Sequence, residues 1–280
     1  MVKITLNDFP AGNIYIKLKK DAILTIISLI KKSNLQLSKK NLDQIYRMKL
    51  NQKVPLHFVK NLAKTFNFPT SYIQENIILI TSSKNTNVGI KNPKLSFNFN
   101  TNDGMIFIAS LMAKGSINRH MQIRFSYSNK NIITAIRKNV QNIFGKVNYK
   151  IYRRQNDSYQ LNLPRIVGLM IIKLKLLPLS KSISNNQIPG FIFKTNKLKK
   201  KLFLEQYIKL KGIVKKKTEI NITINSTTNK KLIIKNLQQF SPKLLIGLKK
   251  LLKEINIKST ITLNSKILNK SNWKFVIKNT

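Results

Sequence analysis

Apolar residues recur at helical spacing over the first 80 positions of the chain. They predict four short helices, at residues 22–32, 39–50, 56–66 and 71–77. Pro55 and Pro69 each stand just before one of these helices, where the fixed φ of proline suits the first helical turn. The pattern therefore predicts a small helical domain over residues 1–80.

Two arrangements of these helices fit the pattern. Several short helices with tight turns suit a helix-turn-helix module, although no base-reading residues mark one here. A plain helical bundle fits the periodicity nearly as well. Both alternatives stay open at this point.

Residues 81–102 separate this domain from the rest of the chain. The stretch is rich in Asn, Ser and Lys and contains Pro93, a composition typical of a linker. Beyond it, residues 103–185 and 186–280 each read as helix, strands and helix. The repeated order predicts an internal duplication of an α+β unit.

The elements expected in the two repeats follow from their apolar periods. Repeat one shows helices at 103–112, 133–145 and 164–176, with strands at 121–128 and 146–154. Repeat two shows a helix at 198–210, a largely helical stretch at 229–255, and strands at 222–228, 259–265 and 273–278.

The charge of the chain narrows its possible partners. It has 52 Lys and Arg against 9 Asp and Glu, a net charge of +43 spread from Lys3 to Lys278. Like charges repel in the folded state unless a polyanion neutralises them, so a nucleic acid is the expected partner. An AT-rich genome explains many lysines but not the scarcity of acids. Membrane-surface proteins concentrate their charge in one segment, which this chain does not do.

The composition also excludes disulfides, thiolate metal sites and membrane-spanning segments. Without cysteine the chain has no disulfide and no thiolate site, and His57 and His120 lack paired-ligand spacing, so neither zinc nor another cofactor is expected. The longest uncharged apolar run, 22–30, is shorter than the roughly 20 residues that cross a bilayer. The first residues resemble neither a signal nor a transit peptide, so we expect a soluble, cytoplasmic protein.

Two segments resemble the LAGLIDADG motif of homing endonucleases. The first is FIASLMAKGSI (107–117), and FLEQYIKLKGIV (203–214) lies about a hundred residues later, where a two-repeat member has its second motif. The flanks resemble the family too, in IPGFI (188–192), in the connector 163–182, and in LLKEINIKSTI (251–261) followed by Trp273. Residues 45–66 are similar to the helix-turn-helix region that precedes the nuclease in some archaeal relatives.

The resemblance implies a pseudo-two-fold α+β fold in a monomer. The two motif helices would pack side by side, and two curved antiparallel sheets would form a saddle over a nucleic-acid groove. In the family, one acid at the end of each motif holds a divalent metal between the cleaved phosphates, because Mg²⁺ requires anionic oxygen ligands.

The two acid positions are both lysine in this chain. Lys114 precedes Gly115 and Lys211 precedes Gly212, while Met112 and Lys209 replace the earlier aspartate of the motif. An ammonium group cannot bind Mg²⁺ and repels it, so no catalytic residue and no metal are expected. A shifted alignment would use Asp103 or Glu205, but Asp103 lies about 16 Å from Lys114 along a helix and suits an N-cap. Glu205 lies six residues before Lys211.

The same lysines can be read as binding residues. Lys114 and Lys211 could reach the phosphates that a metal bridges in an active relative. Alternatively, they are solvent-exposed substitutions that accumulated after the loss of catalysis, and this explains them equally well. The rest of the expected nucleic-acid-binding set lies on or beside the strands, where basic and aromatic residues alternate. It comprises Arg119, Arg124, Tyr127, Lys146, Lys150, Tyr152, Arg153, Arg154, Lys215, Lys216 and Lys217. A strand aromatic is more commonly a core residue, which makes the tyrosines the weaker members.

Four functions are compatible with these features. The scarcity of acids favours a nuclease-inactive protein that binds structured RNA within a ribonucleoprotein such as the ribosome, in contact with ribosomal RNA and neighbouring ribosomal proteins. The N-terminal helices favour a DNA-binding transcription regulator. An intron maturase and an active homing endonuclease remain as alternatives. Phosphate contacts serve RNA and DNA alike, so the sequence does not separate them.

Overall fold

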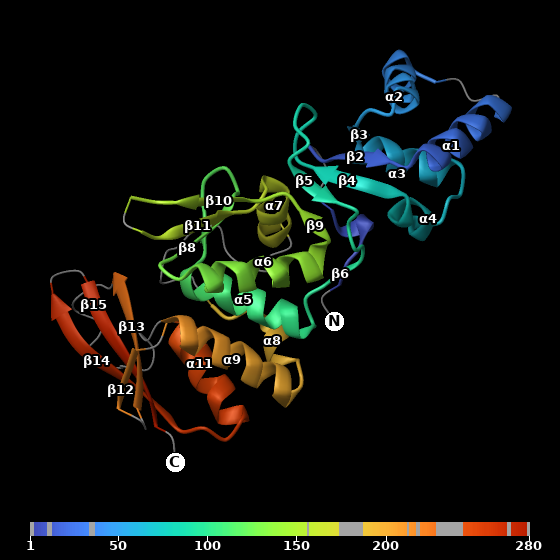
Figure 1. The fold of residues 1–280 in the computed structure, drawn as a ribbon. Coiled ribbons are helices and arrows are strands. Elements are labelled where there is room, and N and C mark those ends of the chain that lie inside the picture. The colour runs from blue at the N-terminus through green and yellow to red at the C-terminus, as the bar shows by residue number, and fades with distance from the viewer. Residues whose placement is uncertain are drawn as a thin grey trace. The chain divides into compact units, whose positions relative to one another are not determined.

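A computed structural model describes residues 3–9, 13–33, 37–155, 157–173, 187–211, 213–216, 219–227, 243–267 and 270–278. The chain divides into two compact units (Figure 1). The first unit comprises residues 1–2, 99–117 and 175–280, and the second comprises residues 3–98 and 118–174. None of the described helices is both long enough and apolar enough to cross a membrane.

The second unit begins with the expected helices. They are α1 (Lys20–Lys32), α2 (Lys39–Lys49), α3 (Leu56–Thr65) and α4 (Thr70–Glu75). Each buries an apolar face, as shown by Ile23 and Ile26 in α1 and by Val59 and Leu62 in α3. The sequence therefore predicted these helices to within a few residues.

A sheet that the sequence pattern did not predict accompanies these helices. Its antiparallel strands run in the order β3 (Val54–Pro55), β2 (Tyr15–Leu18), β4 (Ile77–Thr81), β5 (Gly89–Lys91) and β9 (Lys146–Val147). The N-terminal region is thus mixed rather than purely helical. Ile16 and Leu18 alternate with half-buried positions in β2, the period-two pattern of a strand with one buried face.

The segment 81–102 is more structured than the linker expected there. It contains β5 and β6 (Phe97–Asn98), and β6 pairs with β1 (Lys3–Ile4) just before the single turn of 3₁₀ helix at Leu6–Asp8. Phe97 is fully buried, with its ring centroid 5.0 Å from that of Phe144. These strands are short and flanked by polar residues, which explains why composition alone suggested a linker.

The remainder of the second unit contains three paired antiparallel strands and two helices. Strands β10 (Lys150–Arg153), β11 (Tyr159–Asn162) and β8 (Ile123–Tyr127) lie in that order. The helices are α6 (Lys130–Phe144) and α7 (Arg165–Lys173). The stretch 146–154, expected as one strand, is two strands, because β9 joins the other sheet.

The first unit holds both motif segments. Its helices are α5 (Asn102–Lys114), α8 (Gly190–Phe193), α9 (Lys197–Lys211) and α11 (Lys243–Glu254), and β7 (Ser116–Ile117) follows α5. Its antiparallel sheet has the order β12 (Ile213–Lys216), β13 (Glu219–Thr227), β15 (Lys270–Lys278) and β14 (Ser259–Ile267). Leucines of α11, including Leu245, Leu248 and Leu251, are buried.

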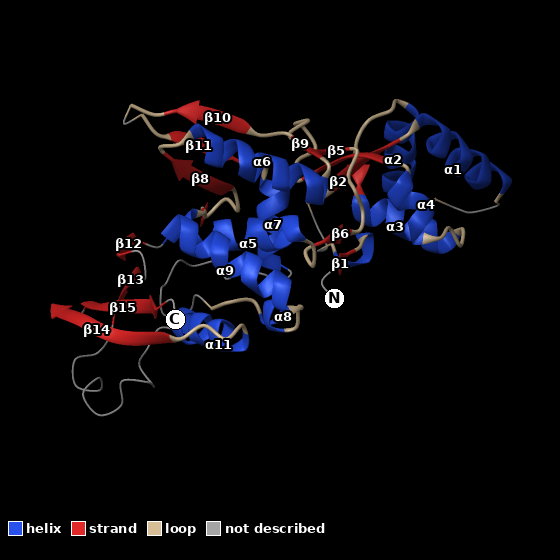
Figure 2. Ribbon diagram, turned by 60° about the horizontal axis from the view of Figure 1, so that its bottom comes forward, coloured by secondary structure: helices blue, strands red, loops and turns tan. Residues whose placement is uncertain are grey.

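Both units combine helices with antiparallel strands, as Figure 2 shows. The predicted α+β class is confirmed. Parts of two expected helices, at residues 174–176 and 229–242, lie outside the described residues. The grouping into compact units differs from the expected division into repeats, because α5 of the first repeat belongs to the same unit as the second repeat.

Candidate nucleic-acid interface

The two motif lysines each end a helix. Helix α5 starts at the N-cap Thr101, whose Oγ1 accepts a hydrogen bond from the Gly104 amide at 3.1 Å, and it ends at Lys114. Gly115 follows as the C-cap, packed so closely on Leu111 that a Cβ would not fit. Helix α9 ends at Lys211. Lys114 is exposed and Lys211 is half-buried.

The motif helices pack against each other within the first unit (Figures 1 and 2). Ser110 of α5 is fully buried, and its Oγ accepts a hydrogen bond from Nε2 of Gln206 in α9 at 2.9 Å. Ala109 and Ala113 of α5 are buried as well, and their small side chains suit close packing of helices. The side-by-side arrangement that the motifs imply is therefore present.

None of the three acids Asp103, Glu205 and Glu254 occupies a position of the two motif lysines. Asp103 lies in the first turn of α5, at the opposite end from Lys114. Glu205 is exposed and lies 3.9 Å from the Lys201 ammonium, and Glu254 pairs with Lys200 at 2.7 Å. In the part of the chain that the structure describes, His, Asp and Glu side chains form no group of three that could hold a metal.

The strands of the second unit carry part of the expected binding set. Arg124 is half-buried on β8, whereas Tyr127 of the same strand is only 9% exposed. Tyr127 shares the buried face of β8 with Ile123 and Phe125, because side chains two residues apart point to the same side. The structure therefore places Tyr127 in the core and not in a groove. Burial raises the pKa of its hydroxyl.

One pocket brings several of the expected residues together. Its volume is about 540 Å³, and Lys150 and Tyr152 of β10 line it beside Tyr149. Tyr152 is 45% exposed. The other lining residues are mostly polar: Ser82, Thr86, Val88, Gln122, Asn148, Asn162, Leu163, Pro164 and Arg165. The pocket combines aromatic rings, carboxamides and two cations, which is the set of groups that can stack on and hydrogen-bond a nucleobase.

Two arginines at or near this pocket do not belong to the binding set that the sequence pattern predicted. Arg165 begins α7 and lines the pocket, and the guanidinium of Arg137 in α6 lies 5.2 Å from the ring centroid of Tyr149. Neither arginine belongs to an alternating basic and aromatic strand. They reach the same region only because α6 and α7 pack on the strands, which no local pattern reveals.

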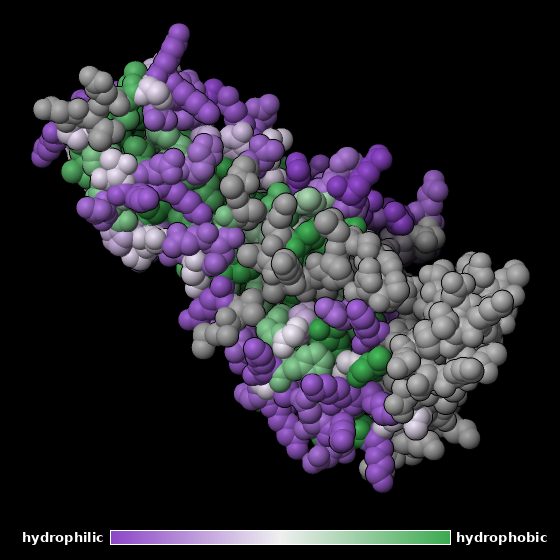
Figure 3. Space-filling view, turned by 180° about the vertical axis from the view of Figure 1, so that it is seen from behind, coloured by the Kyte–Doolittle hydropathy of each residue, from purple (hydrophilic) through white to green (hydrophobic). Residues whose placement is uncertain are grey.

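The other expected residues are dispersed. Lys146 is exposed on β9, in the other sheet, and Arg119 and Arg154 are exposed in loops. Arg153 donates to Asp157 at 2.8 Å in an exposed ion pair. Lys215 and Lys216 belong to strand β12, but their side chains, and all of Lys217, lie outside the described residues. Figure 3 shows hydrophilic residues over much of the described surface in view.

Several solved structures are similar to this chain at low sequence identity. I-DmoI in complex with DNA and Ca matches with 10% identity and a TM-score of 0.41, over 65% of this chain and 85% of that one. The N-terminal LAGLIDADG domain of DUF199/WhiA matches with 15% identity and a TM-score of 0.37, over 66% and 80%. The chain resembles LAGLIDADG proteins. Full-length DUF199/WhiA from Thermatoga maritima, at 15% identity and a TM-score of 0.38, is matched over 64% of this chain and 52% of its own length.

These scores are below 0.5, so the LAGLIDADG likeness rests on the motifs and elements of the chain itself. No family model and no curated protein matches the sequence. Within the LAGLIDADG pattern, the helix-ending positions that the resemblance assigns to metal-binding acids are Lys114 and Lys211. These two positions therefore carry ammonium groups where the resemblance implies carboxylates.

Proposed function

We propose that this chain is a catalytically inactive LAGLIDADG-type protein that binds nucleic acid. We further propose that structured RNA is its partner and that it forms a stable part of a ribonucleoprotein such as the ribosome. The observation that carries the proposal is the net charge of +43. Only nine acids are available to 52 cations, so most of the cations need an external polyanion.

The scarcity of acids favours a permanent partner over a transient one. Asp43, Asp157, Glu205 and Glu254 each form an ion pair with a Lys or Arg side chain. The exposed pairs, Arg153–Asp157 and Lys201–Glu205, contribute little stability, on the order of 0–1 kcal/mol. A protein that stays bound to RNA can dispense with such internal neutralisation, because phosphates surround its cations at all times.

The proposed lack of cleavage rests on the two motif positions. A nuclease of this family needs an anionic oxygen at the end of each motif helix to hold a divalent metal. Lys114 and Lys211 provide ammonium groups there, which donate hydrogen bonds but cannot coordinate a cation. Such groups suit phosphate oxygens instead.

A DNA-binding regulator is the second candidate. The four short helices α1 to α4 favour DNA binding, because one helix of such a packed group can enter a DNA groove. The pocket beside Tyr152 favours RNA, because it suits a base that is not stacked in a duplex.

Binding and cleavage assays on the full chain test these proposals. Affinity for an RNA hairpin with an unpaired loop should exceed that for a DNA duplex of equal length, and it should fall about 10³-fold or more between roughly 50 and 200 mM salt. Incubation of plasmid DNA with Mg²⁺ or Mn²⁺ should give no specific double-strand cut. Preference for the duplex would support the regulator, a shallow salt dependence would contradict phosphate-dominated binding, and specific cuts would overturn the proposed inactivity.

A further inference from the structure

A second pocket, in the N-terminal part of the second unit, has an unusual lining. Its volume is about 430 Å³. The residues that line it are all cations or carboxamides: Lys17, Arg47, Lys53, Lys84, Asn51, Gln52, Asn85 and Asn87. No acid belongs to this set. The pocket beside Tyr152 has two cations among its twelve lining residues, and a pocket at Lys249, Lys253 and Lys258 has three among seven. Both of those pockets also have apolar lining residues, whereas this one has none.

The pocket is assembled from segments far apart in the sequence. Lys17 lies on β2, Arg47 lies in the last turn of α2, and Lys84 lies in the loop between β4 and β5. Antiparallel pairing of β2 with both β3 and β4 brings these segments together. The Lys53 ammonium also donates a hydrogen bond to the Thr86 carbonyl oxygen at 2.7 Å, which joins the segment after α2 to the β4–β5 loop.

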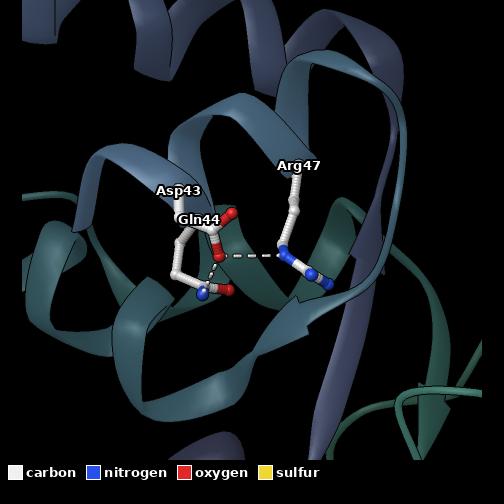
Figure 4. A network of polar contacts seen from close by, with 3 residues as sticks. All are labelled: Asp43, Gln44 and Arg47. Carbon is white, nitrogen blue, oxygen red and sulfur yellow. Dashed lines mark hydrogen bonds and ion pairs between the residues drawn. The ribbon is translucent and has the colours of Figure 1, made fainter. Parts of the chain in front are cut away.

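The side chain of Arg47 is oriented by a neighbouring carboxylate, that of Asp43. Its Nε donates to Oδ2 of Asp43 at 3.0 Å, and the same oxygen accepts a hydrogen bond from Nε2 of Gln44 at 3.0 Å. Figure 4 shows that the two terminal nitrogens of the guanidinium point away from Asp43. Asp43 itself does not line the pocket. The carboxylate therefore orients the arginine while leaving its outer donors available.

The lysines of the pocket repel each other. Partial burial lowers the pKa of Lys53, and the positive charge of Lys17 lowers it further. An anion bound in the pocket would offset both the desolvation of Lys53 and its repulsion by Lys17. The described structure supplies no carboxylate to the pocket for that purpose.

We propose that this pocket binds consecutive phosphates of an RNA backbone. Four cations exceed the single charge of one phosphodiester, so we expect at least two neighbouring phosphates. The carboxamides add donors and acceptors for ribose hydroxyls and phosphate oxygens, as in other backbone contacts. The choice of RNA as the source of the phosphates rests on the proposed function. The site itself adds a binding surface in the second unit, whereas both motif lysines belong to the first.

Two double variants of the full chain test the site. Lys17→Gln with Lys84→Gln removes two pocket cations, whereas Lys64→Gln with Lys138→Gln removes two exposed cations from α3 and α6 of the same unit. Both variants lose the same net charge. Circular dichroism and thermal melting without ligand confirm that each variant folds as the wild type does.

Inorganic pyrophosphate serves as a probe that contains no RNA. It should raise the melting temperature of the wild type and of the Lys64/Lys138 variant, and should raise that of the Lys17/Lys84 variant much less. For an RNA hairpin, the slope of log affinity against log salt should become shallower by about 0.7 for each phosphate that the protein no longer neutralises, and only in the pocket variant.

The outcomes separate the site from the proposed function. If both variants are weakened equally in pyrophosphate and RNA binding, or neither is weakened, the pocket is not a phosphate site, even if the wild type binds RNA tightly. If pyrophosphate stabilises only the proteins with an intact pocket while no RNA binds, the pocket binds phosphate but both the RNA partner and the proposed function are wrong. RNA binding that weakens only in the pocket variant supports both.

Discussion

Gln206 of α9 donates a hydrogen bond from Nε2 to Oγ of Ser110 in α5, at a distance of 2.9 Å. Ser110 is fully buried, so this bond lies within the contact between the two motif helices. Replacing Ser110 with Ala should lower the free energy of unfolding by about 1–2 kcal/mol, because the carboxamide then has no partner in the interface. Urea denaturation followed by circular dichroism measures this change.

A double-mutant cycle isolates this hydrogen bond. Ser110→Ala combined with Gln206→Leu should recover part of the stability, since replacing both polar partners with apolar groups can be nearly neutral. Ser126→Ala, at an exposed position on β8, serves as the matched control and should change stability little. Strictly additive effects of the two substitutions would show that the hydrogen bond does not join the helices in solution.

The start of α5 gives a second stability prediction. A Cβ on Gly104 would overlap the carbonyl oxygen of Phe99, whereas a Cβ on Gly190 in α8 would meet nothing within 4 Å. Gly104→Ala should therefore destabilise the protein by about 1–3 kcal/mol. Gly190→Ala should leave stability unchanged or raise it by up to about 1 kcal/mol, because alanine reduces the freedom of the unfolded chain. Equal melting temperatures for the two variants would contradict the close packing at Phe99.

The motif lysines give a binding prediction. Lys114→Gln with Lys211→Gln should weaken RNA binding and reduce the salt slope by about 0.7 for each phosphate that is no longer neutralised. The matched control, Lys194→Gln with Lys197→Gln, removes two exposed charges from the same unit. Filter binding over a salt series compares the two. If both pairs weaken binding equally, the motif lysines have no special role and drift after loss of catalysis is the better explanation.

The sequence predicted helices more completely than strands. The apolar faces of α1, α3 and α5 are long enough to show the helical period, and their bounds differ from the expected ones by only a few residues. Strands such as β5 and β6 have three and two residues, too few to show alternation. Their structure depends on partners distant in the sequence, as in the pairing of Ile90 with Val147.

The candidate interface also shows that local patterns are predictable from sequence, whereas contacts between distant segments are not. The sequence predicted Lys150 and Tyr152 as binding residues because basic and aromatic residues alternate along one strand, and both line one pocket. Tyr127 was misplaced, since alternation alone does not say which face of β8 is buried. The pocket around Lys17 and Lys53 was not predicted at all, because its residues come from short segments that only strand pairing brings together.

Tyr152 provides the sharpest test of the preference for unpaired RNA. The residue is 45% exposed at the pocket that Lys150 also lines, so a base can reach its ring. Tyr152→Ala should weaken binding to a hairpin loop by about 1–3 kcal/mol, the usual contribution of one stacked base, and Tyr152→Phe should retain most of the affinity. Tyr46, 61% exposed on α2, is the matched control, and Tyr46→Ala should bind as the wild type does.

Comparison of two RNAs completes this test. A fully paired RNA duplex has no free base to stack, so its affinity should not change in Tyr152→Ala, whereas affinity for the hairpin loop should fall. Fluorescence anisotropy with both RNAs, at one salt concentration, measures the difference. A decrease of affinity for both RNAs to the same degree would mean that Tyr152 supports the strand surface as a whole. Unchanged affinity for the loop would mean that the pocket does not take a base, and the preference for RNA would then rest on charge alone.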